Sequence, residues 1–376
     1  MRDKEKKRPE WTPKGQHDGF TTSVMGGIHS SHDGFHNDHA EKKAVHKRKK
    51  LKLQDYIKGV LESDRTIMAR AITLVESNSV KHRTMADELI KALLPKSGHS
   101  VRIGITGMPG AGKSTFIEAL GNLLCDHDHK VAVLAVDPSS SLTKGSILGD
   151  KTRMEKLSTR SEAFIRPSPS GGVLGGVARK SRETMIICEA AGFDVILVET
   201  VGVGQSEITV RSMVDFFLLL TITGAGDELQ GMKKGIMELA DAILINKADG
   251  DNKKQAETTK SEFNRILHYL QPVTPGWHTK AYTCSSVTGS GIGDIWKVIE
   301  AFLKHTKNTG YFEERRHTQA IDWMKDMIEQ YLKKIFYEDK EVKELFEAVQ
   351  ASVKTGKITP ATGAQKLIQA FEGNIE

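Results

Sequence analysis

One stretch of the chain, residues 107–115, has the residue types and the spacing to bind phosphate. It reads Gly-Met-Pro-Gly-Ala-Gly-Lys-Ser-Thr, which satisfies the pattern G-x-x-x-x-G-K-[ST] of nucleoside triphosphatases. Glycines let backbone N–H groups close around phosphate oxygens at the start of a helix, where the helix dipole favours negative charge. Lys113 is expected to reach the β- and γ-phosphates, and the Ser114 hydroxyl is expected to bind Mg²⁺. The predicted nucleotide-contacting residues of this loop are Gly107, Pro109, Gly110, Ala111, Gly112, Lys113, Ser114 and Thr115.

A second motif indicates which base is bound. It comprises Asn246, Lys247 and Asp249, has the pattern N-K-x-D and directly follows an apolar stretch. The Asp249 carboxylate can accept two hydrogen bonds from the guanine N1–H and exocyclic amine, whereas adenine offers no such pair. Downstream of a phosphate loop, this motif predicts binding of GTP and GDP. Ser285 and Ser286 follow the last apolar stretch and resemble the segment whose backbone N–H meets guanine O6.

Three carboxylates are expected around the phosphates. Glu199 ends an apolar stretch and begins Glu-Thr-Val-Gly, which has the placement of the D-x-x-G motif of GTPases, with Glu in place of Asp. Its carboxylate would reach Mg²⁺ through a water, and the Gly202 N–H would sense the γ-phosphate. Asp137 ends another apolar stretch, and Asp150 lies in a loop able to approach the γ-phosphate. Ser114 and the three acids therefore form the predicted Mg²⁺ site, and scattered surface acids are the less favoured interpretation.

The residue that orients the attacking water is not evident. No glutamine directly follows Gly202, as it does in small GTPases, and the role of Gln205 is open. We therefore expect slow intrinsic turnover. Two glycine-dense stretches, 168–176 and 224–235, are expected to permit the loop rearrangement that a nucleotide switch needs.

The hydrophobic pattern of residues 100–304 predicts the elements that hold these motifs. Short apolar strands alternate with helices, and the strands are predicted at 101–106, 131–136, 194–199, 216–222, 242–246 and 281–284. This alternation predicts an α/β fold, a P-loop NTPase domain over 100–305 with a mostly parallel sheet flanked by helices. Ligand chemistry in such folds collects at the carboxyl ends of the strands, where the motifs lie.

Helical patterns flank this domain on both sides. Apolar stripes within 51–99 predict an N-terminal helical module, which Pro95 ends. After residue 305 further stripes predict a helical arm over 306–376, with Thr359-Pro360 at the start of its last helix. Amphipathic helices this far from the sheet need a surface to pack on. A partner subunit and the parent domain both remain open as that surface, and we expect a homodimer through the arm.

Residues 1–50 form a polar tail rich in Gly, His and Lys, which we predict to be disordered. A metal-storing tail and a solvated extension are the two interpretations. The second is favoured because the histidines show no fixed ligand spacing. Residues 1–53 hold 13 Lys and Arg against 7 Asp and Glu, a surplus equal to the net charge of +6 of the whole chain. The remaining residues are therefore neutral, which argues against a nucleic-acid-binding face.

Composition also bears on location. Three widely spaced cysteines, at positions 125, 188 and 284, make no metal or redox spacing and are typical of a reducing compartment. No apolar run reaches the 18 or so residues of a membrane-spanning helix. A signal peptide requires an apolar region after its charged start, and this chain has none there. The early acids Asp3, Glu5 and Glu10 disfavour a mitochondrial presequence. We expect a cytoplasmic protein without a membrane partner.

Together these residues resemble the MeaB/ArgK/MMAA family, the GTPases that chaperone methylmalonyl-CoA mutase and related B12-dependent acyl-CoA mutases. The resemblance covers about residues 52–376 and rests on segments in family order: 107–115, 136–141, 149–154, 198–207, 224–235 and 246–249. It implies an α/β P-loop domain, an N-terminal helical extension and a C-terminal helical dimerisation arm. It also implies GTP hydrolysis that gates delivery of adenosylcobalamin and protects the mutase from inactivation.

The resemblance also implies roles for single residues. Lys113 would bind phosphate, and Asp137, Asp150 and Glu199 would be the metal and catalytic acids. Lys233 would belong to a third switch loop that responds to the partner. The implied catalytic set is therefore Lys113, Asp150, Glu199 and Lys233. The His-rich residues 1–50 depart from the family pattern, and nothing carries over to them.

Two other classes of function remain as alternatives. A nickel-insertion GTPase would suit the His-rich tail, but none of the cysteines pairs with a nearby Cys or His by the switch loops. A P-loop kinase for a small substrate is the other alternative, as the old name ArgK suggests. The guanine motif and the lack of an obvious acceptor pocket speak against a kinase.

Overall fold

The computed structural model describes residues 51–136, 154–167, 174–200, 206–224 and 234–373. The chain divides into two units, residues 1–50 and 51–376, and only the second contains described residues. The predicted disorder of the tail therefore lies outside the described part. No helix among the described residues is long and apolar enough to cross a membrane.

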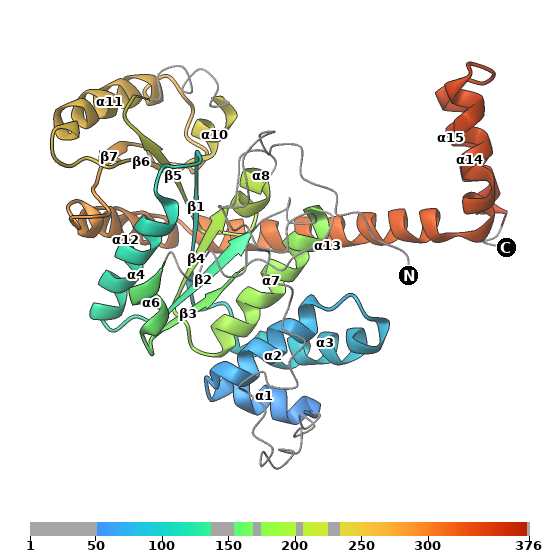
Figure 1. The fold of residues 1–376 in the computed structure, drawn as a ribbon, viewed down its shortest axis with the longest axis horizontal. Helices are drawn as coiled ribbons and strands as arrows, with labels where there is room; N and C mark the ends of the chain where they lie inside the picture. The colour runs from blue at the N-terminus through green and yellow to red at the C-terminus, as the bar shows by residue number, and fades with distance from the viewer. Residues whose placement is uncertain (1–50, 137–153, 168–173, 201–205, 225–233, 374–376) are drawn as a thin grey trace, which may run out of the picture. The chain divides into compact units, whose positions relative to one another are not determined.

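A seven-stranded sheet in the order β3-β2-β4-β1-β5-β6-β7 forms the centre of the second unit (Figure 1). All of its neighbouring strands pair in parallel. The strands are β1 Val101–Gly107, β2 Val131–Val136, β3 Ala163–Arg166, β4 Val195–Thr200, β5 Phe216–Ile222, β6 Ala242–Asn246 and β7 Ala281–Thr283. The predicted α/β fold with a parallel sheet is confirmed.

The strand bounds show where the hydrophobic pattern was sufficient. Strands β2, β5 and β6 have the predicted bounds, and β1, β4 and β7 differ by a single residue at one or both ends. Strand β3 was not predicted. It has four residues and pairs only with β2 among the described strands, so its apolar run is too short to distinguish it from a loop.

Helices cover both faces of the sheet, and alternate residues of each strand pack against different layers. On β2, Ala132 and Leu134 belong to a core shared with α7 (Leu174–Ala190) and α8 (Ser206–Arg211), whereas Val131 and Val133 face α4 (Lys113–Asp126) and α12 (Ile292–Asn308). A third core joins β6 to α10 (Lys234–Leu239) and α11 (Asn252–Leu267). The short α6 (Glu155–Thr159) packs beside α4 through Leu157. Burial on both faces explains why the strand sequences are continuously apolar.

The N-terminal module consists of α1 Leu53–Leu61, α2 Arg65–Glu76 and α3 Val80–Leu93, followed by a short 3-10 turn, η1 Leu94–Lys96. The three predicted apolar stripes are thus helical. Their buried side chains, including Met68, Ile72 and Leu89, join the core that contains α7. Asp64 caps α2 by accepting hydrogen bonds from the N–H groups of Thr66 and Ile67.

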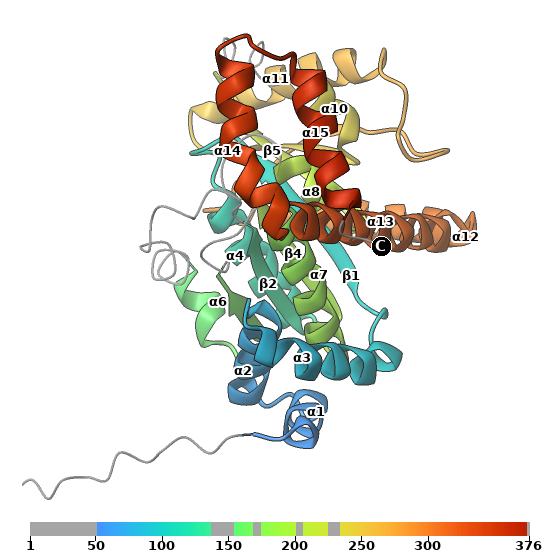
Figure 2. The same cartoon turned by 90° about the vertical axis from the view of Figure 1, so that its right-hand side faces the viewer.

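The C-terminal helices are α13 Tyr311–Glu338, α14 Lys340–Lys354 and α15 Pro360–Glu372. Helices α14 and α15 lie side by side (Figure 2). Thr359 caps α15 with an Oγ1 that accepts a hydrogen bond from the Thr362 N–H, as predicted. The first turns of α13 bond to the sheet-bearing part of the chain, and farther along α13 several apolar side chains are half exposed: Ile321, Met324, Ile328, Tyr331 and Leu332.

Candidate nucleotide site

The predicted phosphate loop lies between the end of β1 and the start of α4, as its motif requires. Gly107 and Gly112 have φ values of 148° and 87°. A Cβ on Gly107 would lie 2.1 Å from the carbonyl oxygen of Leu220, and a Cβ on Gly112 would lie 2.7 Å from Nδ2 of Asn246. Glycine is therefore required at both positions by steric exclusion as well as by backbone conformation.

Lys113 is the first residue of α4, and its side chain folds back over the loop. Its Nζ donates hydrogen bonds to the carbonyl oxygens of Gly107, at 2.8 Å, and Met108, at 3.3 Å. Pro109 and Gly110 are exposed at the tip of the loop, and Ala111 is buried beneath it. The ammonium group thus lies at the helix N-terminus, where a bound phosphate is expected.

Ser114 and Glu199 meet although they are 85 residues apart in the sequence. Strands β1 and β4 are neighbours, so the end of β4 comes beside the start of α4. The Ser114 Oγ donates a hydrogen bond of 3.0 Å to Oε1 of Glu199, whose side chain is buried. A hydroxyl and a carboxylate are the oxygen donors that Mg²⁺ prefers, so these residues fit the predicted metal site. Behind them, Thr200 Oγ1 donates to Thr106 Oγ1 at 2.9 Å.

Asn246 links the phosphate loop to the base-binding segments. Its Nδ2 donates a hydrogen bond of 2.8 Å to the carbonyl oxygen of Ala111. Its Oδ1 accepts hydrogen bonds from the backbone N–H of Ser286, at 3.1 Å, and from the Ser286 hydroxyl, at 2.8 Å. The sequence predicts that Asn246 and Ser286 belong to the base-binding segments, and the structure adds that Asn246 bridges three segments.

Asp249 and Ser285 also come together, because β6 and β7 are neighbours. The Ser285 hydroxyl donates a hydrogen bond to the Asp249 carboxylate, and the Ala248 N–H donates to the Cys284 carbonyl at 2.9 Å. Lys247 is exposed and has a φ of 61°, a strained value for a residue with a side chain.

Sequence reasoning missed two residues that hold this loop. The Asn252 side-chain amide donates to the Lys247 carbonyl at 2.6 Å, and its Oδ1 accepts from the Thr223 hydroxyl, also at 2.6 Å. The only sequence signal for these residues is their position: Asn252 comes shortly after the guanine motif, and Thr223 comes directly after β5, at the same edge of the sheet. Asn252 and Thr223 therefore help to hold the strained backbone of Lys247 in place.

The three cysteines are all buried, and Cys284 lies within the base-binding segment. Its Sγ donates to Asn246 Oδ1 at 3.4 Å, and burial raises the pKa of its thiol to about 12. Such a thiol stays protonated at neutral pH and serves as a packing group, not as a nucleophile.

Several predicted residues lie outside the described part of the chain: Asp137, Asp150, Gly202 and Lys233. The same holds for Gln205 and for most of both glycine-dense stretches. The strands that lead to Asp137 and Gly202 nevertheless end side by side, since Val136 pairs with Thr200 in the register of β2 and β4.

A phosphate loop, a hydrogen-bonded Ser–Glu pair and an N-K-x-D segment converge at one edge of a parallel sheet, and this arrangement defines a P-loop GTPase. The profile of the family described as Methylmalonyl Co-A mutase-associated GTPase MeaB matches residues 68–341. The chain belongs to this family.

Relatives from two bacteria and the mouse agree with this assignment. The putative GTPase of Caulobacter vibrioides is 50% identical over 312 residues, which span 83% of this chain and 95% of that protein. GTPase ArgK of Escherichia coli is 44% identical over 320 residues, 85% of this chain and 97% of that protein. The Mus musculus protein named Methylmalonic aciduria type A homolog, mitochondrial, is 40% identical over 324 residues, 84% of this chain and 78% of that protein.

A solved structure supports the same fold. The crystal structure of an LAO/AO transport system kinase matches with a TM-score of 0.70 and 37% identity, covering 85% of this chain and 97% of that chain. With its relatives named as GTPases and its fold that of a P-loop NTPase, the protein is an enzyme that hydrolyses GTP.

Proposed function

We propose that this GTPase serves a B12-dependent acyl-CoA mutase of the methylmalonyl-CoA mutase type. GTP hydrolysis would gate the loading of adenosylcobalamin and protect the mutase from inactivation. The match of the mutase-associated GTPase family over residues 68–341 carries this proposal. The mouse relative, whose name refers to methylmalonic aciduria, supports the same metabolic setting.

Within the site, we assign the chemistry to the groups that the phosphate loop brings together. Lys113 stabilises charge on the transferred phosphoryl group, because its ammonium lies at the loop carbonyls of Gly107 and Met108. Ser114 and Glu199 hold Mg²⁺, with Asp137 and Asp150 completing the set of acids. When bound, Mg²⁺ neutralises the negative charge of the β- and γ-phosphates. Asp249 and the Ser285–Ser286 segment select guanine.

A second copy of the chain is the other partner we propose. The half-exposed apolar residues of α13 continue into an apolar groove between α13, α14 and α15, lined by Leu332, Phe336, Tyr337, Phe346, Leu367 and Phe371. Exposed apolar surface of this kind is typical of an interface. Replacing the half-exposed Ile328 by Asp should lower the mass measured by light scattering. The exposed neighbour Glu329, replaced by Ala, is the control, and an unchanged mass for Ile328→Asp would contradict an interface through α13.

The decisive experiment for the mutase measures GTP turnover with and without the candidate mutase. In unassisted switch GTPases turnover is on the order of 10⁻⁴ to 10⁻² s⁻¹, and we expect the partner to raise it about 100- to 1000-fold. Lys233→Ala should remove this increment, and Lys234→Ala, one residue along, is the matched control. Equal stimulation of both variants would show that Lys233 does not transmit the effect.

The same experiment separates the alternatives. If the mutase neither binds nor stimulates, and the full chain binds nickel, the protein is a nickel-insertion GTPase. Among the described residues, no group of three or more His, Cys, Asp or Glu is placed to hold a metal ion. Phosphate release without any added acceptor would exclude the kinase.

A further inference from the structure

Two buried carboxylates hold the first turns of α13 at the amino-terminal edge of the sheet, opposite the nucleotide site. Asp215 immediately precedes β5, and Asp241 immediately precedes β6. Each is 2% exposed, and each faces one of two consecutive arginines of α13, Arg315 and Arg316. The two arginines make different contacts, and this difference is informative.

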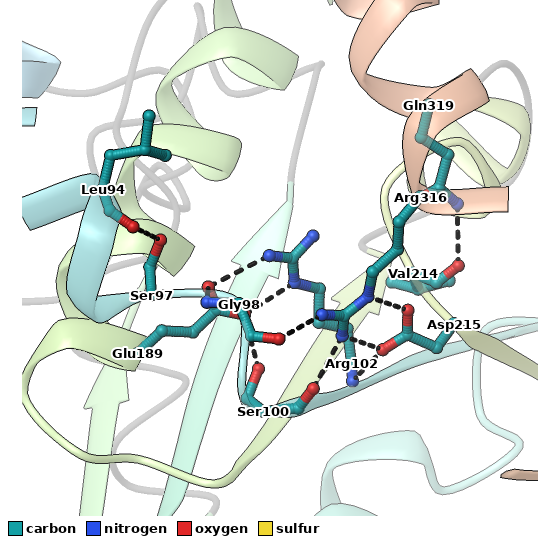
Figure 3. A network of polar contacts seen from close by, with 10 residues as sticks. All are labelled: Leu94, Ser97, Gly98, Ser100, Arg102, Glu189, Val214, Asp215, Arg316 and Gln319. Carbon is teal, nitrogen blue, oxygen red and sulfur yellow. Dashed lines mark hydrogen bonds and ion pairs between the residues drawn. The ribbon is translucent and has the colours of Figure 1, made fainter. Parts of the chain in front are cut away.

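Arg316 is held by a saturated network (Figure 3). Its Nε and Nη2 donate to the two oxygens of Asp215 at 2.8 and 2.7 Å. Its Nη1 and Nη2 also donate to the carbonyl oxygens of Gly98 and Ser100. The second Asp215 oxygen accepts from the Arg102 N–H at 2.8 Å. This arginine therefore fastens α13 to the segments that enter β1 and β5.

Arg315 shares its carboxylate with a residue of α8. Asp241 lies 3.2 Å from Nη1 of Arg211, the last residue of α8, and 3.7 Å from Nη1 of Arg315. It also accepts hydrogen bonds of 2.9 Å from the Phe217 N–H and the Thr274 hydroxyl. Neither Nη of Arg315 has a hydrogen-bond partner among the described residues, even though the side chain is nine-tenths buried, with only 10% exposed. Arg315 is thus held mainly by the charge of Asp241. The same carboxylate holds Arg211, because its Oδ1 accepts a hydrogen bond of 3.3 Å from Nη2 of Arg211.

Helix α8 in turn packs tightly against the strand that leads to the phosphate loop. A Cβ on Gly104 of β1 would lie 2.9 Å from Cγ1 of Val210, a residue of α8. It would also lie 2.9 Å from Cγ2 of Val214, which follows α8, and 2.8 Å from Cδ2 of Phe217 in β5. Gly104 is three residues before Gly107 in the sequence. Helix α8 begins at Ser206, six residues after the end of β4 at Thr200. A small shift of α8 therefore acts on the two strands that carry the phosphate loop and Glu199.

The C-terminal end of α8 is clamped from a second side. Arg182 of α7 donates to the Ser212 carbonyl at 2.9 Å and to the Ser212 hydroxyl at 2.8 Å, and it also donates to the Gln319 carbonyl of α13 at 3.0 Å. Gln319 donates its Nε2 to the Val214 carbonyl at 2.9 Å. The segment that directly follows α8 is thus joined to α13 through Arg182 and through Gln319.

We propose that Arg315 is a positioning residue for GTP hydrolysis: through Asp241 and Arg211 it holds α8 against β1, so the placement of α13 sets the geometry of the nucleotide edge. This inference concerns the GTPase activity itself and holds whichever protein is the partner. A ligand that displaces α13 would then change the rate of GTP hydrolysis, because it would move Arg315 away from Asp241, the carboxylate that holds Arg211.

Consecutive arginines make a matched test in the full-length protein. Arg315→Met should lower kcat for GTP about tenfold while KM changes less than about twofold, because a displaced site loses transition-state stabilisation more than ground-state binding. Arg316→Met removes more hydrogen bonds and should lower the melting temperature at least as much, yet leave kcat within about twofold. Equal kcat for Arg315→Met and wild type would overturn the proposal, as would a loss of kcat in both variants that follows their melting temperatures.

Two further measurements separate positioning from general destabilisation. If Arg211 and Arg315 act through the same Asp241, the double variant Arg211→Met with Arg315→Met should have a kcat no lower than that of the less active of the two single variants. Multiplied effects on kcat would contradict the shared route. Arg315→Lys keeps the charge and should recover kcat to within about threefold of wild type.

Gly104→Ala perturbs α8 from the opposite side and keeps the proposal testable if Arg315→Met does not fold. The added methyl group must push Val210, Val214 and Phe217 aside, so kcat should fall about tenfold or more with KM for GTP nearly unchanged. A Gly104→Ala enzyme with wild-type kcat would show that the contact between α8 and β1 does not set the nucleotide edge.

Discussion

The two edges of the same parallel sheet use charged groups in opposite ways. At the carboxyl edge, Lys113, Ser114 and Asp249 are partly exposed and bond to loop carbonyls or to single side chains. At the amino edge, Asp215 and Asp241 are almost wholly buried and bonded from several segments at once. Figure 3 shows Arg316 and Gln319 of α13 beside Asp215 at the latter edge.

This contrast separates a site that exchanges ligands from one that holds an element in place. A partly exposed group can exchange a protein partner for a phosphate or a base at little cost. A buried carboxylate cannot be left without its partners except at a cost of several kcal/mol. The difference predicts that substitutions at the carboxyl edge impair binding and turnover, and that those in the Asp215–Arg316 network of the amino edge mainly impair stability.

The largest expected effect is at the carboxyl edge. Lys113→Ala should abolish hydrolysis, and Glu199→Ala and Asp150→Ala should slow it on the order of 100-fold or more with a modest loss of binding. Single-turnover phosphate release measures all three. The exposed Lys91 of α3, replaced by Ala, is the control for loss of a lysine. Wild-type rates in all three variants would place the active site elsewhere.

The next effect is at the amino edge. Asp215→Asn leaves Arg316 buried without its counter-charge and should cost about 3–5 kcal/mol of unfolding free energy. Urea denaturation measures this loss. The exposed pair of Asp294 and Lys297 supplies the control, since Asp294→Asn should leave the midpoint unchanged. A loss of GTP affinity without a loss of stability in Asp215→Asn would break the contrast between the edges.

A smaller effect tests base selection. Asp249→Asn removes a charged acceptor for guanine and should weaken GTP binding by about 1.5–3 kcal/mol, measured by isothermal titration. Asp251→Asn, at an exposed position two residues along, should bind GTP like the wild type. If the wild-type protein binds ATP as tightly as GTP, the guanine assignment is wrong.

The smallest effect is a dependence of stability on pH that belongs to the amino edge. Burial alone would raise the pKa of Glu189, but the hydrogen bond and charge of Arg102, with Ser100 and the Gly98 N–H, outweigh it and hold the pKa below the ordinary value of 4.5. A depressed carboxyl pKa contributes stability that is present above the unfolded value and is lost as pH falls through the folded value.

Glu189→Gln should therefore be less stable than wild type at pH 7. The difference should shrink as the pH falls from 4.5 through the lower pKa of the folded state, because the carboxylate of the unfolded chain then binds a proton before that of the folded chain does. Urea midpoints at pH 7, 4 and 3 measure the trend. A difference that stays constant across this range would show that the Glu189 charge does not contribute.

The sequence alone determined the class of fold and predicted which motifs meet at the carboxyl edge. Continuous apolar runs mark β2, β5 and β6 because a strand buried on both faces needs apolar residues at every position. The residues after those runs, among them Asn246 and Asp249, were identifiable because loop chemistry at this edge is local. A few adjacent residues make each motif.

Only the tertiary structure decided the amino edge. Asp215 and Asp241 lie far along the chain from Arg315 and Arg316, and all four look like ordinary surface charges in the sequence. Their burial depends on α13 reaching back across the entries of β5 and β6, and on Arg102 and Arg211 arriving from other elements. Charge pairing over such separations leaves no periodicity or spacing in the chain, since it is set by which strands become neighbours.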